Sequence, residues 1–306
     1  MKTFRGRTAV ITGAASGFGL ECSRLAAREG MNIVMADVQA DALERAAAEI
    51  NTTLVAGAGV LRYRLDVAQG HEVEALAAAT VARFGAPHVV FNNAGVGAGG
   101  LIWEHSAQDW AWVLGVNVMG VAHGVRVFTP LMLAAAAADA GYEGHIVNTS
   151  SMAGLLNPPN MGAYNVSKHA VVSLSETLYQ DLALVSEQVT ASVLCPYFVP
   201  TGIHQSHRNR PAEMLTAGAK PTRSQRIAQA MTGKAVESGK VSAADVAALV
   251  FDALRVKRFY IYSHPKALAA VQTRLEDVMQ ARNPSDPFAA RPEIGAELRA
   301  SLRNNV

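Results

Sequence analysis

Short, almost uninterrupted apolar segments recur along the chain, and each gives way to a polar or glycine-containing turn. The first runs from Thr8 to Thr12 and the second from Asn32 to Asp37. A continuous apolar run of this length is typical of a strand that is buried on both faces. Seven segments share the pattern, at residues 8–12, 32–37, 60–65, 88–91, 144–148, 189–194 and 259–262.

Stretches with helical periodicity lie between these strands. Gly30 is a plausible cap at the end of the first helix, and Ser242 with Asp245 resembles a capping box at the start of a later one. Helices are predicted at residues 18–29, 41–50, 72–84, 106–138, 162–185, 242–255 and 266–281. Residues 202–239 show no strong period, and a polar tail ends the chain.

Strands that alternate with helices predict a parallel sheet with helices on both faces, a doubly wound α/β fold. The chain has 306 residues, and half of them are hydrophobic, so a sizeable core is expected. No internal repeat or linker divides the sequence. We therefore expect a single domain that spans residues 1–306.

The charge and cysteine content exclude several classes of protein. The net charge of +2 argues against a partner held by bulk charge, such as nucleic acid or a membrane surface. Cys22 and Cys195 are far apart and predict neither a disulfide framework nor a metal site. Residues 1–7 lack the apolar centre of a signal peptide, and the longest apolar runs look too short or too interrupted to span a membrane. We expect a soluble, cytoplasmic protein.

A glycine-rich turn separates the first predicted strand from the first predicted helix. It runs from Thr12 to Gly19. Glycines let the backbone approach a diphosphate, and the helix start offers free N–H groups and a positive dipole end. A turn of this kind in a strand–turn–helix setting predicts a dinucleotide site, although a plain tight turn remains the alternative.

Asp37 ends the second predicted strand, 18 residues after Gly19. A carboxylate at this place can accept hydrogen bonds from an adenosine ribose, and it would repel a 2′-phosphate. No arginine stands among residues 14–16 or 38–39 to receive such a phosphate. The sequence therefore favours NAD over NADP, unless Asp37 only caps the following turn.

Tyr164 and Lys168 lie four residues apart on a predicted helix and so share one face. A phenol has an ordinary pKa of about 10, too high for a general base at neutral pH. A neighbouring positive charge stabilises the phenolate and lowers that pKa. The pair is a candidate acid/base device, and a surface pair is the alternative on these two residues alone.

Together, several motifs resemble the short-chain dehydrogenase/reductase family over residues 5–262. They are the turn from Thr12 to Gly19, Asp66-Val67, Asn92-Asn93-Ala94-Gly95, Asn117, Ser151 and the Tyr164…Lys168 pair. The resemblance implies a Rossmann-type dinucleotide-binding and catalytic core, with a substrate lid at residues 202–240 and a C-terminal extension at 263–306. The extension resembles those of a subset of the family that includes aryl alcohol Cα-dehydrogenases.

The resemblance also implies roles for single residues. Tyr164 would be the acid/base, Lys168 would lower its pKa and hold the nicotinamide ribose, and Asn117 would anchor a water in a proton relay. Ser151, 13 residues before Tyr164, would hydrogen-bond the substrate oxygen, with Ser150 as the competing candidate. The residues implied to contact NAD are Gly13, Ser16, Gly17, Phe18, Gly19, Asp37, Val38, Asp66, Val67, Asn93, Ala94, Gly95, Tyr164, Lys168, Pro196, Val199 and Thr201.

The chain departs from the family after its sixth predicted strand. The family usually has Pro-Gly-x-Val-x-Thr, and here Tyr197 takes the place of the glycine, between Pro196 and the matching Val199 and Thr201. Tyr197 would either shape the substrate pocket, beside Ser151 and Tyr164, or point into the core. Residues 202–240 are rich in Lys and Arg, which fits a site for an anionic substrate or simply a solvated face.

These features favour an NAD(H)-dependent oxidoreductase that interconverts a secondary alcohol, apolar or aromatic, and its ketone. The alternatives are an NADPH-type carbonyl or acyl-thioester ketoreductase and a non-catalytic NAD-binding regulator with the same fold. The predicted helices at 106–138 and 162–185 resemble the pair that joins subunits in family oligomers. The resemblance thus implies a homodimer or homotetramer; no metal, nucleic acid or membrane partner is expected.

Overall fold

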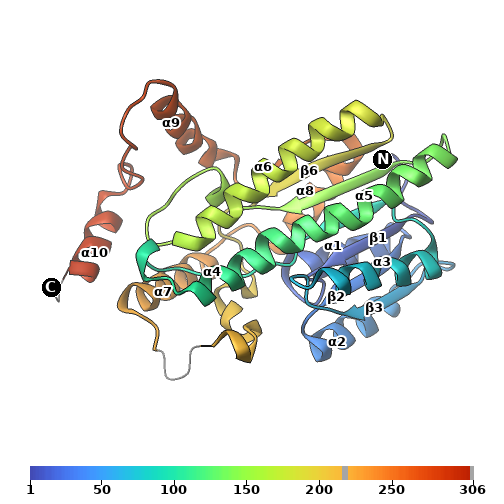
Figure 1. The fold of residues 1–306 in the computed structure, drawn as a ribbon, viewed down its shortest axis with the longest axis horizontal. Coiled ribbons are helices and arrows are strands. Elements are labelled where there is room, and N and C mark those ends of the chain that lie inside the picture. Colours follow the sequence, from blue (N-terminus) through green and yellow to red (C-terminus); the bar gives the residue numbers. More distant parts are fainter. Residues whose placement is uncertain (216–219, 304–306) are drawn as a thin grey trace.

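The computed structural model describes residues 1–215 and 220–303. Seven parallel strands form one sheet in the order β3-β2-β1-β4-β5-β6-β7, as Figure 1 shows. The strands are β1 (Thr8–Thr12), β2 (Asn32–Asp37), β3 (Val60–Arg64), β4 (Val89–Asn92), β5 (Gly144–Thr149), β6 (Val189–Cys195) and β7 (Tyr260–Tyr262). All seven predicted strands are confirmed, with ends that shift by a residue at most places.

Helices cover both faces of this sheet, so each face has its own hydrophobic core. On one face, side chains of α1 (Gly17–Arg28), α2 (Ala40–Asn51) and α8 (Ala243–Val256) pack against the strands. On the other face, α3 (Gly70–Phe84), α5 (Gly120–Ala138) and α6 (Gly162–Val185) do the same. The predicted doubly wound α/β fold is confirmed, including the capping box of Ser242 and Asp245 at the start of α8.

The strand order reverses between β1 and β4. β2 and β3 extend the sheet to one side of β1, whereas β5, β6 and β7 extend it beyond β4. The turns that leave the carboxyl ends of β1 and β4 therefore diverge to opposite faces and leave a crevice between them, the place where open α/β sheets bind ligands. The glycine-rich turn and Asn93-Ala94-Gly95 both lie at this edge.

The predicted helix at 106–138 contains an irregularity that the periodicity did not predict. It consists of α4 (Ala107–Leu114), a π-helical turn (η2, Gly115–Met119) and α5, which includes Pro130. By length and composition Ala107–Ala138 is apolar enough to cross a membrane, so the expectation that every apolar run is too short was wrong here. Only 28% of its most apolar window is buried, and that part packs on the sheet through residues such as Phe128 and Met132.

The segment that follows β6 is largely helical. η4 (Gly202–Asn209) and η5 (Ala212–Met214) are short 3₁₀ helices, and α7 (Arg223–Glu237) is a full α-helix opened by a capping box of Thr222 and Gln225. The sequence showed no strong period here, and α7 is therefore a helix that it did not predict. Part of the predicted lid, residues 216–219, lies outside the described residues.

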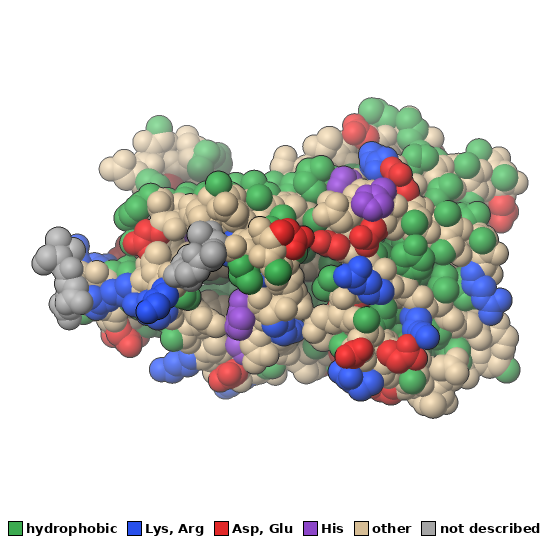
Figure 2. Space-filling model, turned by 60° about the horizontal axis from the view of Figure 1, so that its bottom comes forward, with side chains coloured by type: hydrophobic (Ala, Val, Ile, Leu, Met, Phe, Trp, Pro, Cys, Tyr) green, Lys and Arg blue, Asp and Glu red, His purple; other side chains and the backbone are tan. Residues whose placement is uncertain are grey.

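The C-terminal extension leaves the sheet and returns toward the lid. After a short turn (η6, Pro265–Ala267), α9 (Leu268–Met279) leads to α10 (Pro292–Arg303), which contacts α7 (Figure 1). α10 replaces the expected polar tail, and it begins with a proline, whose fixed φ suits a first helical position. On the face drawn in Figure 2, basic and acidic side chains are interspersed, so the small net charge is not concentrated there.

Candidate active site

The turn between β1 and α1 is shaped by its glycines. Gly13 and Gly17 have φ values of +64° and +54°, which side-chain-bearing residues rarely adopt. A Cβ on Gly19 would lie 2.2 Å from the carbonyl oxygen of Gly13. Ser16 at the start of α1 makes no side-chain capping bond, and the first turn holds no acidic residue. The helix therefore presents uncapped N–H groups and its positive end to the crevice.

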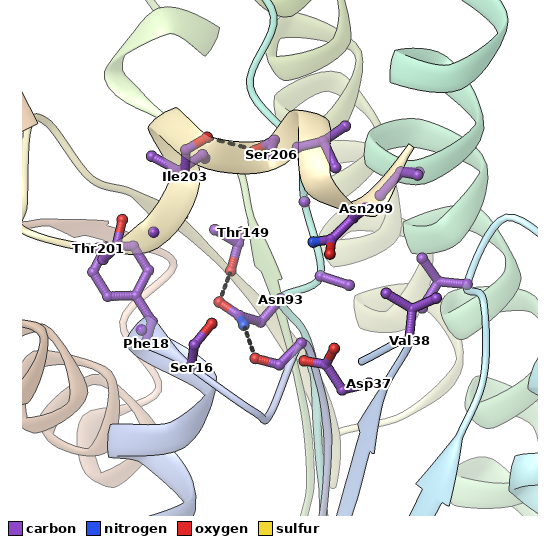
Figure 3. A pocket seen from close by; sticks show the side chains of 18 of the residues that line it. Ser16, Phe18, Asp37, Val38, Asn93, Thr149, Thr201, Ile203, Ser206 and Asn209 are labelled. Carbon is purple, nitrogen blue, oxygen red and sulfur yellow. Dashed lines mark hydrogen bonds between the residues drawn. The ribbon is translucent and has the colours of Figure 1, made fainter. Parts of the chain in front are cut away.

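Asp37 is held at the carboxyl end of β2 by backbone donors. Its Oδ2 accepts a hydrogen bond from the N–H of Ala15 at 3.0 Å, and its Oδ1 accepts one from the N–H of Gln39 at 2.9 Å. Burial raises the pKa of the carboxyl, and these backbone donors oppose the change. The side chain is thereby fixed in one orientation on the wall of the crevice (Figure 3).

Asn93 ties the two diverging strands together beneath this crevice. Its side-chain amide donates to the carbonyl of Thr12 at 3.0 Å, its backbone N–H donates to the hydroxyl of Thr12 at 2.9 Å, and its Oδ1 accepts from Thr149. Figure 3 shows the bond between Asn93 and Thr149 within the cleft. Asn93 thus fixes the turn after β1 relative to the turns after β4 and β5.

A single cleft runs over these elements. It encloses about 1100 Å³ of empty space including its open mouth. It brings together these residues implied from the sequence: Gly13, Ser16, Gly17, Phe18, Asp37, Val38, Asp66, Val67, Asn93, Ala94, Gly95, Tyr164, Lys168, Pro196 and Thr201.

Tyr164 and Lys168 lie on the first turns of α6 and face the same cleft. The Lys168 Nζ atom is 5.6 Å from the centre of the Tyr164 ring and donates to the carbonyl oxygen of Thr149 at 3.0 Å. Burial raises the pKa of Tyr164 to about 12, and the hydroxyl of Ser151 acts in the opposite direction. Burial lowers the pKa of Lys168 to about 8. At neutral pH the pair is therefore a phenol beside an ammonium.

Asn117 is buried in the π-helical turn and faces the strand-end segment that follows β4. Its Oδ1 accepts from the N–H of Val96 at 2.8 Å, and its Nδ2 donates to the carbonyl of Val96 and to the hydroxyl of Ser167, both at 3.0 Å. A Cβ on Gly95 would lie 3.4 Å from Asn117 and 3.5 Å from the Lys168 ammonium. The side chain is thus next to Lys168, but its bonds are structural.

The sequence and fold of known proteins match this chain closely. The sequence profile of the short chain dehydrogenase family matches residues 7–212. The chain belongs to the short-chain dehydrogenase/reductase family. It shares 54% identity and a TM-score of 0.90 with a crystal structure of a short chain dehydrogenase/reductase from Burkholderia phymatum in complex with NAD, covering 94% of this chain and 100% of that one.

Curated relatives of this protein cover nearly the whole chain. It is 36% identical over 274 residues to the 1-deoxy-11-beta-hydroxypentalenate dehydrogenase of Streptomyces exfoliatus, spanning 89% of this chain and 88% of the relative. It is 31% identical over 300 residues to a C alpha-dehydrogenase of Sphingobium, spanning 97% and 93%. The second match includes the C-terminal extension.

Five of the residues implied from the sequence do not line the cleft itself. Gly19 and Val199 serve packing, and Asn117 lies behind the wall. Ser151 starts the 3₁₀ turn η3 (Met152–Gly154), where its hydroxyl accepts from the N–H of Ala153 and donates to the carbonyl of Pro196 at 3.3 Å. Tyr197 is 46% exposed and packs edge-on against Phe198 and His264, so it does not point into the core.

The two candidate serines differ in their surroundings. The hydroxyl of Ser150 donates to the backbone carbonyl of Lys168 at 2.7 Å and is fully buried. That bond joins the loop after β5 to α6 and leaves little capacity for a substrate. Ser151 makes a longer bond to Pro196 and interacts with the Tyr164 hydroxyl, although Ser150, and not Ser151, lines the cleft.

The sequence did not reveal several residues of the cleft. Those contributed by η4 are Gly202, Ile203, Ser206, Arg208 and Asn209, and others are Gln39, Leu65, Val96, Trp112, Val116 and Thr149. Ser150, the competing candidate from the sequence, also lines the cleft. η4 lies over the cleft, opposite Asp37 and Val38 (Figure 3). The only sequence signal for these η4 residues was the basic character of residues 202–240, which does not indicate which of them line the cleft.

Proposed function

We propose that this protein catalyses the reversible, NAD(H)-dependent oxidation of a secondary alcohol to a ketone. The observation that carries the proposal is that Tyr164 and Lys168 face the same cleft as the uncapped start of α1 and the buried Asp37. Tyr164 can accept a proton, Lys168 can supply a stabilising positive charge, and the start of α1 can bind a diphosphate. The similar structure from Burkholderia phymatum contains NAD, which supports the same cofactor here.

The residues of the cleft fit a dinucleotide on their own chemistry. The uncapped N–H groups of α1 suit a diphosphate, and Gly13 and Gly17 let it approach the backbone. Asp37 has both oxygens anchored by backbone N–H groups, with remaining lone pairs for ribose hydroxyls. Lys168 is within reach of a ribose at the other end of the cleft. Bound NAD would supply the acceptor for the hydride that leaves the alcohol carbon.

In the oxidation direction, Tyr164 removes the hydroxyl proton of the alcohol and Ser151 donates a hydrogen bond to the same oxygen. The positive charge of Lys168 favours the phenolate form of Tyr164 and so makes it a better base. In the reverse direction, neutral Tyr164 donates its proton to the ketone oxygen. Its pKa of about 12 in the unliganded protein means that Tyr164 is protonated at neutral pH, ready for that donation.

We propose a mid-sized apolar or aromatic alcohol as the substrate. Met152, buried beside Ser151, packs with Leu155 and Leu156 and gives this side of the site an apolar character. Two relatives are named for the oxidation of a hydroxypentalenate and for C alpha-dehydrogenation, and those names are compatible with a carbon-rich secondary alcohol. A panel of aliphatic and benzylic secondary alcohols, assayed for NADH formation, tests this.

We also propose a cytoplasmic homodimer or homotetramer. The apolar Ala107–Ala138 helix is mostly unburied in one chain, and its Met119 and Val166 of α6 are exposed. A second copy of the chain would bury this surface. Light scattering on the purified protein measures the mass, and a monomer at micromolar concentration would contradict the proposal.

Tyr164→Phe tests the mechanism. Loss of the phenol oxygen is expected to lower turnover by at least about a hundredfold, the usual contribution of a general acid or base. The binding of NADH should change by less than about twofold, because the ring remains. Tyr179→Phe is the control, since Tyr179 lies on the same helix but packs on Phe259 away from the cleft. Turnover of Tyr164→Phe near that of the control would refute the mechanism.

Asp37→Ala tests the preference for NAD. The unchanged protein is expected to bind NADH more tightly than NADPH, because the Asp37 carboxylate repels a 2′-phosphate. The substitution should weaken NADH and strengthen NADPH, and together these changes bring the two dissociation constants within about tenfold, about 1.4 kcal/mol. Calorimetry measures both. Tighter binding of NADPH by the unchanged protein would show that the argument from Asp37 is wrong.

A further inference from the structure

One guanidinium group lies at the mouth of the cleft without an acidic partner. Arg208 belongs to η4 and lines the cleft, as do Asp37 and Gln39 from the end of β2. Its Nη1 atom donates to the carbonyl oxygens of Gly202 and Gln205 at 2.9 and 3.0 Å, and its Nε approaches the side-chain oxygen of Gln39 at 3.5 Å. The side chain thus spans from the lid to the sheet edge in a defined orientation.

Arg208 forms no ion pair within the part of the chain that the structure describes, although its charge acts on Asp37 at longer range. None of the described carboxylates lies within 4.0 Å of it, and its Nη2 atom has no hydrogen-bond partner there. Arg210, two residues later, is different: it is ion-paired with Asp109 and lies over the ring of Trp112. Arg210 therefore fixes the lid to α4, whereas Arg208 keeps free donors and a free charge.

The position of Arg208 relates it to the start of α1. Arg208 lies against Gly202, because a Cβ added to Gly202 would be 2.9 Å from the Arg208 Nη2 atom. The preceding residue, Thr201, lies against the start of α1, because a Cβ added to Gly17 would be 3.4 Å from the Thr201 methyl group. The guanidinium is thus close to the segment that covers the uncapped helix start. Two positive features, one from the lid and one from the helix, face the same part of the cleft.

We propose that Arg208 binds the diphosphate of the dinucleotide cofactor from the lid side and so holds η4 closed over it. The inference rests on the proposed function, because it requires a dinucleotide in the cleft. A planar guanidinium with unused donors is suited to phosphate oxygens. A 2′-phosphate on the adenosine ribose is the competing ligand for the guanidinium group of Arg208. It is disfavoured because it would lie against the Asp37 carboxylate. The charge of Arg208 lowers the pKa of Asp37 and so favours the negative form that repels a phosphate.

Calorimetric titrations with cofactor fragments test the proposal without any turnover. The variants are Arg208→Gln, Arg208→Lys and the control Arg226→Gln. Arg226 is an exposed arginine of α7 that likewise donates to a backbone carbonyl, that of Pro221. The ligands are NADH, ADP, adenosine and 2′,5′-ADP. Charge-assisted hydrogen bonds predict that Arg208→Gln weakens NADH and ADP by about tenfold or more, with adenosine within about twofold.

Further readouts separate binding of phosphate from a structural role of Arg208. Arg208→Lys should recover part of the ADP affinity, and the salt dependence of ADP binding should be smaller in Arg208→Gln than in the control. ADP should protect residues 202–209 from hydrogen exchange in the unchanged protein but not in Arg208→Gln. These results together would support a clamp on the diphosphate.

Three outcomes would overturn the proposal. Equal losses for adenosine and ADP would make Arg208 a structural residue, and a loss confined to 2′,5′-ADP would assign it to a 2′-phosphate. Unchanged ADP affinity in Arg208→Gln, with normal NADH binding by the unchanged protein, would refute the clamp but leave the proposed function intact. Failure of the unchanged protein to bind NADH or ADP would instead refute both.

Discussion

Replacement of Lys168 by methionine is expected to stabilise the unliganded protein although it removes activity. Lys168 is 2% exposed, and burial lowers its pKa from the ordinary 10.5 to about 8. Each pKa unit corresponds to about 1.4 kcal/mol, so the buried ammonium costs about 3 kcal/mol when both the folded and unfolded states are charged. Methionine also cannot form the hydrogen bond from Lys168 to the carbonyl of Thr149, which reduces the stabilisation by about 1 kcal/mol. The net stabilisation is therefore about 2 kcal/mol at pH 7.

The pH dependence has a definite sign. Below pH 8 the lysine is charged in both states and the cost is complete; between pH 8 and 10.5 the folded state releases its proton first, so the cost fades as pH rises. Thermal unfolding without cofactor should give Lys168→Met a midpoint roughly 3 °C higher at pH 7, and no advantage at pH 10.5.

The control for this experiment is Lys234→Met, which replaces an exposed lysine of α7 and should show no such dependence on pH. The reasoning would be refuted by a Lys168→Met variant that is less stable than the unchanged protein at pH 7. A stability difference that does not vary between pH 7 and 10.5 would refute it as well.

Two further substitutions test the framework of the site. Gly19→Ala should unfold the turn and weaken NADH binding by more than about tenfold, because its Cβ would lie 2.2 Å from the carbonyl oxygen of Gly13. The control, Gly233→Ala, lies in the open part of α7 and should be neutral or stabilising by up to about 1 kcal/mol. Calorimetry measures NADH binding and thermal melting measures stability. Asn117→Ala should lower the free energy of unfolding by about 2–4 kcal/mol, since it leaves the N–H and C=O of Val96 buried without a partner. A urea titration that gives a loss below about 0.5 kcal/mol, as for a surface substitution, would contradict this.

The sequence predicted the sheet well because its five inner strands are almost wholly buried and largely apolar, whereas the edge strands β3 and β7 are partly exposed. It also predicted those parts of the site that lie at strand ends and within one helix, such as Asp37 and the Tyr164–Lys168 pair. These positions follow from local chain geometry alone. The family model and the similar structures then confirmed the family to which the motifs pointed.

The parts that were not predicted depend on contacts between distant segments. α7 has a polar, weakly periodic sequence that resembles that of a loop. The helix is stabilised by its capping box and by its contacts with η4 and α10. Arg208 is 169 residues along the chain from Gln39, and only the folded lid brings them together. The absence of an arginine next to Asp37 in the sequence thus did not mean its absence in space.

The π-helical turn at Gly115–Met119 sets the rotational phase between α4 and α5. It holds one residue more than a regular helical turn would, and each residue of an α-helix accounts for about 100° of rotation. If Val118 were deleted, the helix could become regular only by turning either Asn117 away from Val96 or Phe128 away from the sheet. We therefore expect the helix to tolerate substitutions better than a deletion. The additional residue of the π-helical turn sets the orientation of Asn117 relative to Phe128.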